Sequence, residues 1–453
     1  MPSNQTFTEG TIFPKLLRFA LPVLLALLLQ AMYGAVDLLI VGQFSSPADV
    51  SAVSTGSQIM QTMTVVVTGL SMGVTVLVGR KIGEGKSGEA GQVIGCGIFL
   101  FACLAVGLTI GMLLTATPLT NLMHAPEEAF SQTVSYVRIC SAGTVFIVAY
   151  NLVGSIFRGI GDSKMPLITV SIACVLNILG DLLLVAGLHW GSAGAALATV
   201  AAQAVSVLLS LVMIRRRSLP FAVSRRSFRL QSGVLRQILF LGIPIALQDL
   251  LVSVSFLAIL AIVNNLGLIP SAGVGVAEKL CAFIMLVPSA YMQAMSAFVA
   301  QNMGANRPDR ARRVLLYGII SSLAIGLLMA YASFFHGDIL ATLFARDAAI
   351  VAAAADYLKA YAIDCLLTSF LFCLIGYFNG CGKTVFVMLQ GILGAFCIRI
   401  PISYLMSRRP GTTLFHIGLA TPASTAVQIL LCGLYFLLQT RQFRRSSQEQ
   451  AGA

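Results

Sequence analysis

The chain has 453 residues, of which 57% are hydrophobic and only 10% are charged. A soluble domain averages about 25% charged residues, so this composition excludes an ordinary soluble protein and predicts an integral membrane protein. The net charge of +12 does not indicate nucleic-acid binding, because the basic residues fall between apolar runs, where membrane topology accounts for them.

Apolar runs long enough to cross a bilayer as helices recur along the whole chain. A membrane-spanning helix needs about 20 predominantly apolar residues, and windows of this kind predict an all-α integral membrane protein with twelve transmembrane helices. The unusually long spans at 52–79 and 271–301 predict tilting or extension beyond the bilayer. The predicted spans are 16–42, 52–79, 92–116, 132–157, 165–188, 191–214, 236–263, 271–301, 314–335, 351–378, 385–406 and 415–439.

The basic residues between the spans predict the orientation of the chain. If the N-terminus is cytoplasmic, nearly all Lys and Arg residues of the loops lie on the cytoplasmic side, and the exceptions are Arg346, Arg408 and Arg409. This asymmetry predicts a multi-pass protein of the cell (inner) membrane with both termini inside. The pair Arg408 and Arg409 runs against the rule, and the sequence offers no reason for it.

Two sets of six spans repeat each other. Segment 78–90 resembles 299–311 and segment 156–164 resembles 377–384, both at a numbering offset of 221 (299 − 78), while Pro22 and Pro244 match at 222 (244 − 22). Because six is even, both sets share one orientation, with a pseudo-symmetry axis along the membrane normal. We expect an N-lobe at 1–217, a basic cytoplasmic linker at 218–235 and a C-lobe at 236–453 with a short cytoplasmic tail, around a central cleft.

The sequence contains no pattern that indicates an enzyme or a bound cofactor. The ten cysteines form no C-x-x-C pair or Cys/His cluster, which argues against zinc and against a disulfide framework. The polar segment 1–13 does not resemble a cleavable signal peptide. The glycine-rich turns at 79–86 and 158–164 differ from phosphate-binding loops. No ATPase motif occurs, so active transport would draw on an ion gradient.

Five carboxylates lie inside predicted spans. A charge at the centre of a bilayer costs about 2.5–3.5 kcal/mol even on lenient insertion scales, so each acid is a candidate for a functional site. The alternatives for any one acid are a structural ion pair or a side chain that reaches the membrane surface from a helix end. The five are Asp37, Asp181, Asp249, Glu278 and Asp364.

Counting depth along the helices gathers polar residues of the first lobe into one layer of its outer half. At a rise of about 1.5 Å per residue, residues of four predicted helices reach a similar depth. Hard cations such as Na⁺ take oxygen ligands, and two nearby carboxylates in a medium of low dielectric constant would share a proton. The layer therefore predicts a cation or proton site formed by Asp37, Tyr136, Asn177, Asp181 and Thr199, in which Asp37, Asn177, Asp181 and Thr199 could bind Na⁺.

The second lobe does not repeat this layer. At the offset of 221, the counterparts of Asn177 and Asp181 are Ile398 and Ile402, and Asp37 maps near Ile259. We therefore expect a single ion site, confined to the first lobe. Methionine and aromatic side chains suit a polyspecific substrate surface, with ordinary helix packing as the alternative. The candidate cleft or substrate residues are Gln30, Gln248, Asp249, Glu278, Met285 and Asp364.

Over essentially its full length the chain resembles the MATE (multidrug and toxic compound extrusion) transporters. The resemblance rests on Pro22, Gln30, Asp37 and Gly42 of the first span and on the runs GLSMG at 69–73, VGRKIGEG at 78–85, YNLVGSIFRGIGDSKMP at 150–166, NILGDLLLV at 177–185, WGSAGAALATV at 190–200 and VAQNMGAN at 299–306. It implies twelve helices in two lobes around a V-shaped cleft. It also implies export of bulky, often cationic drugs against inward Na⁺ or H⁺.

The resemblance extends to the predicted ion site. One archaeal and bacterial branch of the family binds its cation in the first lobe, and the matching positions here are Asp37, Tyr136, Asn177, Asp181 and Thr199. A further Asn of that branch aligns with Gly154, with Asn151 nearby. Another branch has acids in helices 7 and 10; this chain lacks the helix-7 Glu, and Asp364 is displaced by about one turn.

Together these observations favour a secondary active multidrug antiporter with alternating access. Its expected partners are amphipathic or cationic small molecules and the lipid bilayer, with Na⁺ or H⁺ as the coupling ion, and we expect a monomer. The alternative is a lipid-linked oligosaccharide flippase of the same broad superfamily, although such proteins often have fourteen spans and cationic clefts. The buried acids disfavour a passive channel, and the lack of a nucleophile–base constellation disfavours an enzyme.

Overall fold

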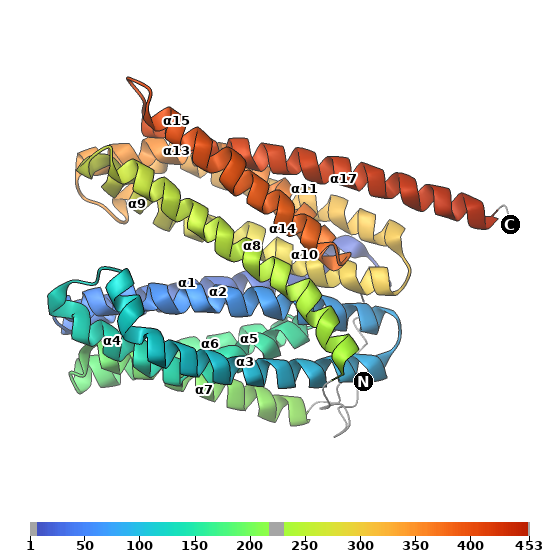
Figure 1. The fold of residues 1–453 in the computed structure, drawn as a ribbon, viewed down its shortest axis with the longest axis horizontal. Helices are drawn as coiled ribbons and strands as arrows, with labels where there is room; N and C mark the ends of the chain where they lie inside the picture. The colour runs from blue at the N-terminus through green and yellow to red at the C-terminus, as the bar shows by residue number, and fades with distance from the viewer. Residues whose placement is uncertain (1–6, 217–230, 452–453) are drawn as a thin grey trace. The chain divides into compact units, whose positions relative to one another are not determined.

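The structure, a computed structural model, describes residues 7–216 and 231–451. Most of the predicted basic linker at 218–235, including Arg225, Arg226 and Arg229, lies outside the described residues, as does Arg217 at the end of the predicted N-lobe. Within the described residues all regular secondary structure is helical (Figure 1).

The chain divides into two compact units. The first contains Met1–Asp249, Ser296–Arg312 and Asn379–Gly382, and the second contains Leu250–Met295, Arg313–Phe378 and Lys383–Ala453. Helix α8 (Ser232–Asn264) therefore contributes its first part to one unit and its second part to the other. The predicted lobe boundaries at 217 and 236 stay a prediction.

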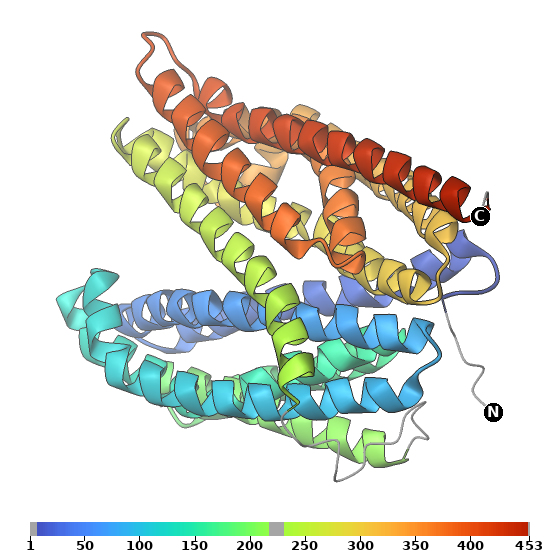
Figure 2. The ribbon, with the colours of Figure 1, turned by 45° about the vertical axis from the view of Figure 1, so that its right-hand side comes forward.

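The first half of the chain forms helices α1 to α7, which pack side by side in the first unit (Figure 2). Helices α4 and α5 meet at Gly143 with their axes bent by 51°. A Cβ atom at Gly143 would collide with the side chain of Val200, so the close packing of this junction against Val200 requires glycine. The elements are α1 (Ile12–Phe44), α2 (Pro47–Gly83), α3 (Ser87–Leu122), α4 (Glu127–Ala142), α5 (Thr144–Ile160), α6 (Lys164–Asp181), the π-helical stretch η1 (Leu182–Gly187) and α7 (Gly191–Arg216).

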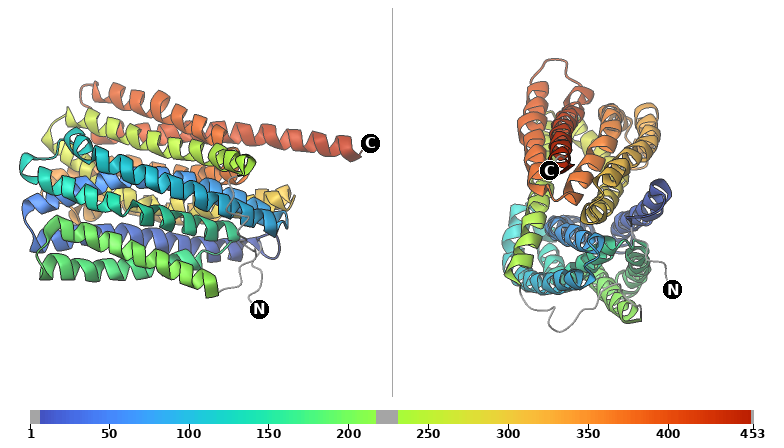
Figure 3. Two further views of the ribbon diagram at one scale, coloured as in Figure 1. Left: turned by 60° about the horizontal axis from the view of Figure 1, so that its bottom comes forward. Right: turned by 90° about the vertical axis from the view of Figure 1, so that its right-hand side faces the viewer.

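The second half forms helices α8 to α17, which Figure 3 shows from two further directions. Its π-helical stretch, η3 (Leu393–Arg399), continues α14 and runs directly into α15. The remaining elements are α9 (Leu268–Ile284), α10 (Leu286–Gly304), α11 (Pro308–Phe335), α12 (Gly337–Thr342), α13 (Ala348–Gly380), α14 (Thr384–Ile392), α15 (Ile400–Ser407), α16 (Leu414–Gly418) and α17 (Ala420–Ala451).

The helices account for all twelve predicted spans. Among the described residues, eleven helical segments are long and apolar enough to cross a membrane, and the bent pair α4–α5 makes a twelfth. The two spans expected to be long correspond to α2 and to α9 with α10, each segment covering 37 residues. The multi-pass, all-helical fold class is therefore confirmed, while the orientation of the termini stays a prediction.

Small residues bring α2 and the first part of α8 into backbone contact. A Cβ atom at Gly73 would lie 2.8 Å from the backbone nitrogen of Gly242, and one at Gly69 would overlap the backbone of Ala246. Membrane helices use small residues in this way because lipid tails supply no hydrophobic force between helices, and close van der Waals contact replaces it.

Residues Phe7–Glu9, which we call the N-terminal strap, bind to the end of α10 and to the first turn of α11. The backbone N–H of Phe7 donates to Oε1 of Gln301 at 3.1 Å, and the Phe7 carbonyl accepts from Nε of Arg310 at 3.0 Å. The Phe7 ring stacks on Phe298 with centroids 4.3 Å apart. Gln301 also donates to the carbonyl of Gly159 at 2.9 Å, so the end of α10 is tied to α5 as well.

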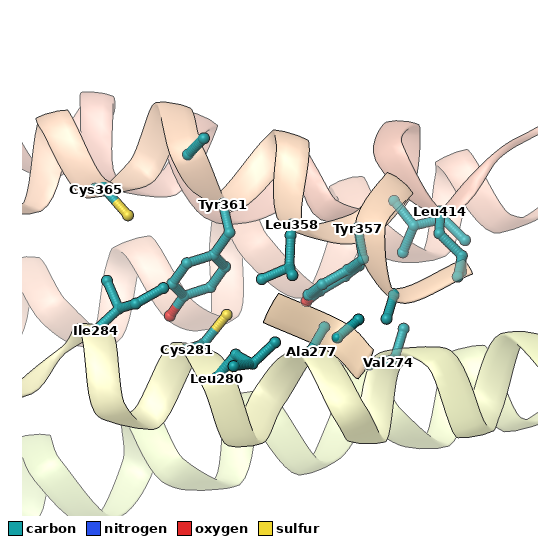
Figure 4. Close-up of a cluster of buried hydrophobic side chains, with 14 of the residues drawn as sticks. Val274, Ala277, Leu280, Cys281, Ile284, Tyr357, Leu358, Tyr361, Cys365 and Leu414 are labelled. Atoms are coloured by element: carbon teal, nitrogen blue, oxygen red, sulfur yellow. The ribbon is translucent and has the colours of Figure 1, made fainter. Parts of the chain in front are cut away.

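One apolar core of the second unit lies between α9 and α13. Figure 4 shows Tyr357 and Tyr361 of α13 projecting toward Ala277 and Cys281 of α9. Both tyrosines are almost completely buried. Met285, a predicted substrate residue, packs against this core.

Candidate functional site

The polar centre of the first unit is formed by Asp37 on α1 and Asp181 at the end of α6. Asp37 is 5% exposed and Asp181 is fully buried. Helices α6 and α7 approach closely at Gly180, where a Cβ atom would lie 2.9 Å from the Cβ of Ala198. This close approach brings Asp181 and Asn177 of α6 next to Thr199 of α7.

A short chain of hydrogen bonds connects three helices at this centre. Nδ2 of Asn177 donates to the hydroxyl of Thr199 at 3.2 Å, and that hydroxyl donates to Oδ2 of Asp37 at 3.3 Å. The carboxyl groups of Asp37 and Asp181 lie within hydrogen-bonding reach of each other. Two ionised carboxylates are both acceptors and repel one another, so this contact requires a proton or a cation between them.

Four buried acceptor oxygens around the pair have no hydrogen-bond donor among the described residues. They are Oδ1 of Asp37, Oδ1 of Asn177 and both carboxyl oxygens of Asp181. Leaving a buried polar atom unpaired costs about 1–3 kcal/mol, and more when the atom is charged. A small hard cation or a proton satisfies such a group of oxygens, and neutral Asn and Thr oxygens are suitable further ligands for Na⁺. The described residues include no cluster of three or more His, Cys, Asp or Glu side chains that could hold a metal ion.

A pocket opens beside this centre. Asn177 and Thr199 line it together with four further polar residues, Gln30, Tyr33, Tyr150 and Gln203. Its volume suits about one water molecule or a bare cation and is far too small for a drug-sized molecule. Gln30, predicted as a cleft residue, donates from Nε2 to the Tyr150 hydroxyl at 3.1 Å.

Tyr136, the fifth predicted site residue, is buried near the pair and interacts electrostatically with Asp37. Its hydroxyl shares a hydrogen bond with the thiol of Cys140, and its ring fills the space left by Gly56 on α2. The structure therefore joins Asp37, Asn177, Asp181 and Thr199 directly and places Tyr136 beside them without a hydrogen bond to Asp37.

The sequence analysis missed the pocket residues Tyr33, Tyr150 and Gln203. Gln203 was the most detectable, because it follows Thr199 by four residues on α7 and so lies on the same helix face. Its Oε1 is another buried acceptor without a partner among the described residues.

The acids of the second half do not form a matching pair. Oδ1 of Asp364 accepts from the Thr425 hydroxyl at 2.6 Å, and Oε1 of Glu278 is buried without a partner among the described residues. Asp249 and Gln248 lie on α8 in the first unit, where Gln248 is 7% exposed.

The structure corrects the residues assigned as counterparts of Asn177 and Asp181. Along α6, buried residues from Pro166 to Cys174 match buried residues from Val387 to Ala395 at the offset of 221. Beyond that point the buried residues Asn177 and Asp181 match Arg399 and Ser403, at an offset of 222. Because a π-helical turn holds one more residue than an α-helical turn, η3 shifts the register by one. Ile398 and Ile402 are therefore not the structural counterparts.

Comparison with known proteins shows that both repeated halves of the chain match one protein family. The sequence profile of the MatE family matches residues 22–183 and again residues 244–405. The starts and the ends of the two matched segments both differ in number by 222 (244 − 22 and 405 − 183). The probable multidrug resistance protein YpnP of Bacillus subtilis (strain 168) is 26% identical over 414 residues, which cover 91% of this chain and 92% of the relative.

Two further relatives agree with this match. The multidrug export protein MepA of Staphylococcus aureus (strain MRSA252) is 23% identical over 415 residues, covering 90% of each chain. The solved outward-facing conformation of a multidrug resistance MATE family transporter superposes with a TM-score of 0.92 at 21% identity, over 98% of this chain and 99% of that one. At that identity the superposition establishes the fold.

Proposed function

The chain belongs to the MATE family of membrane transporters, which are not enzymes, and we propose that it exports amphipathic or cationic drugs in exchange for Na⁺ or protons bound at Asp37 and Asp181. The observation that carries this proposal is the set of four buried, unpaired acceptor oxygens around that pair. If the pair were only structural, these buried oxygens would stay without hydrogen-bond partners, at a cost in the free energy of folding. A transported cation binds them in one state of the protein and leaves them in another.

The proposed coupling follows from the charge of the pair. Without an ion the two carboxylates repel one another, and binding of Na⁺ or a proton removes that repulsion. The ion draws Asp37 toward Asp181, so α1 repacks against α6, and the affinity for a cationic substrate falls. The ion drives transport only if it binds the two states with different affinity. Because one chain supplies all four grouped residues, a monomer is sufficient for this cycle.

The main test is Asp37→Asn, measured as drug uptake into everted membrane vesicles loaded with Na⁺ or with acidic buffer. The amide keeps the size of the side chain and removes its charge, so we expect ion-driven uptake to fall at least about tenfold. Asp347→Asn is the matched control, because Asp347 is exposed and caps α13 through its side chain, a role that Asn fills equally well. Uptake by Asp37→Asn at the rate of the control would overturn the proposal.

The same vesicles distinguish the drug exporter from a lipid-linked oligosaccharide flippase. A cationic dye in the absence of lipid-linked sugars is a substrate for an exporter only. We expect dye uptake that follows the Na⁺ or proton gradient and stops when an ionophore removes it. Dye uptake that is absent under every gradient would favour the flippase.

A further inference from the structure

The ends of α2 and α10 cross in close backbone contact within the first compact unit. A Cβ atom at Gly83 of α2 would overlap the carbonyl group of Gln301 in α10. A Cβ atom at Gly304 of α10 would overlap the carbonyl group of Arg80 in α2. Small residues are what allow two membrane helices to approach this closely, so both glycines are required for the crossing.

This crossing is symmetric in the numbering of the repeat. Gly83 and Gly304 are 221 residues apart (304 − 83), and Arg80 and Gln301 are separated by the same number (301 − 80). Each glycine therefore touches the repeat counterpart of the residue that the other glycine touches, as happens across a two-fold axis. The two halves of the chain thus contact one another here about the axis of the repeat.

The N-terminal strap binds beside this crossing. Gln301 accepts the N–H of Phe7 through Oε1 at 3.1 Å and donates from Nε2 to the carbonyl of Gly159 at 2.9 Å. Gly159 of α5 packs in turn on α2, where a Cβ atom would lie 2.8 Å from the carbonyl oxygen of Thr75. The strap, α10, α5 and α2 are therefore joined by one continuous series of contacts.

The side chain of Phe7 is the anchor of the strap, and it is only 3% exposed. Its ring stacks on Phe298 of α10 with centroids 4.3 Å apart and meets Phe19 of α1 edge to face at 4.9 Å. Behind it lies Gly161, where a Cβ atom would be 3.3 Å from the ring. We call the space between these three residues the Phe7 slot. One ring in this slot connects α1 and the end of α5 with α10.

The other printed contacts of the strap use its backbone carbonyls. Their donors are the side chains of Asn302 to Phe7 at 3.3 Å, of Arg307 to Thr8 at 2.7 Å, and of Arg310 to Phe7 at 3.0 Å and to Glu9 at 2.8 Å. A carbonyl accepts a hydrogen bond whatever side chain its residue carries. A substitution at Phe7 therefore removes the ring and leaves these acceptors in place.

We infer that the strap is a latch for the crossing. The Phe7 ring keeps the end of α10 against α5 and α2 while it is docked, and it must leave the Phe7 slot before α2 and α10 separate. This inference rests on the proposed function, because alternating access requires a second state that is open at the face of the membrane bearing the strap. The strap leads into α1, which begins at Ile12 and carries Asp37, so repacking of α1 on ion binding reaches the latch directly.

Hydrogen–deuterium exchange of the purified, full-length protein tests the latch without any drug or ion gradient. In Phe7→Ala we expect backbone amides at 79–86 and 300–306, the ends of α2 and α10, to exchange at least about tenfold faster, because the crossing opens more often. Phe44→Ala is the matched control, since Phe44 is an exposed phenylalanine at the opposite end of α1. It should leave exchange at these two segments unchanged.

The end of α2 decides the result, because the strap contacts described above all go to other elements. Faster exchange in the strap and α10 alone would make the strap a local tie and would overturn the inference, as would unchanged exchange throughout. Phe7→Leu keeps an apolar side chain in the Phe7 slot and should show a smaller increase at the same residues. If Phe7→Ala does not fold, Phe7→Leu decides the question by the same criterion at α2.

Drug uptake into everted vesicles separates failure of the latch from failure of the proposed function. In the predicted orientation the strap lies on the outer side of such vesicles. A larger open fraction lowers the half-saturating drug concentration on that side, and we expect Phe7→Ala to lower it at least about threefold. An unchanged value would mean that the opening seen by exchange is not used in transport, which overturns the inference. If even the unaltered chain takes up no drug, the proposed function fails, and the exchange result alone decides the latch.

Discussion

The two halves of the chain place different charges at equivalent positions of the same repeat. In the first half, Asp37 and Asp181 meet with only Asn177 and Thr199 as neutral neighbours, and four acceptor oxygens stay unpaired. In the second half, Asp364 has a threonine partner and a buried guanidinium nearby. At the repeat position of the neutral Asn177, the second half therefore carries the positive charge of Arg399.

Asn177→Arg should have the largest effect, because it copies the second-half arrangement into the first. We expect the new guanidinium to occupy the place of the coupling ion and to reduce ion-driven drug uptake by at least about 100-fold. Asn177→Leu, which removes the polar group without adding charge, serves as the comparison and should reduce uptake less. Vesicle uptake under a Na⁺ or proton gradient measures both, and equal losses would contradict the explanation by charge.

Removing the threonine hydroxyl that donates to a carboxylate should change ion affinity in the first half and not in the second. Thr199→Val deletes a hydrogen bond to a charged group, worth about 1.5–3 kcal/mol, and should weaken ion binding about tenfold or more. Thr425→Val deletes the hydrogen bond that Asp364 accepts in the second half and should leave ion affinity unchanged. Titration calorimetry with Na⁺, or proton uptake on acidification, compares the ion affinities of the two variants. An equal loss of affinity in both variants would contradict the expectation that only the first half binds the ion.

Phe256→Leu should have the smallest effect. It removes the aromatic face below the Arg399 guanidinium, an interaction worth about 0.5–2 kcal/mol. The variant should therefore unfold at a lower temperature while its ion affinity stays at the original value. The control is Phe240→Leu, which changes an exposed aromatic residue of the same helix. Altered ion affinity in Phe256→Leu alone would mean that the second half takes part in ion binding.

The fold was predictable because each span is a long apolar window and the offset between the halves is nearly constant. Depth counting also worked for Asp37, Asn177, Asp181 and Thr199, since regular helices convert residue number directly into height. It placed Tyr136 near them but could not show that its hydroxyl turns toward Cys140.

What the sequence could not reveal depends on irregular backbone. A constant offset assumes unbroken α-helix, and the extra residue of η3, which ends at Arg399, invalidates that assumption. A signal was nevertheless present, because Arg399 is a basic residue inside the predicted span 385–406. Considering only the acids inside the spans overlooked it.

The pocket residues Tyr33, Tyr150 and Gln203 were missed because their meeting depends on how α1, α5 and α7 pack, which no single helix reveals.

The N-terminal strap has a consequence for how the chain is synthesised. The hydrogen bond from Phe7 to Gln301 joins residues 294 positions apart. At translation rates of about 5–20 residues per second, Phe7 waits roughly 15–60 s after its own synthesis before Gln301 exists. During that interval α1 is present in the nascent protein without the partner of its leading segment. Docking of the strap is therefore among the late steps of assembly, and a chain that stops before α10 can insert its first helices but cannot complete this contact.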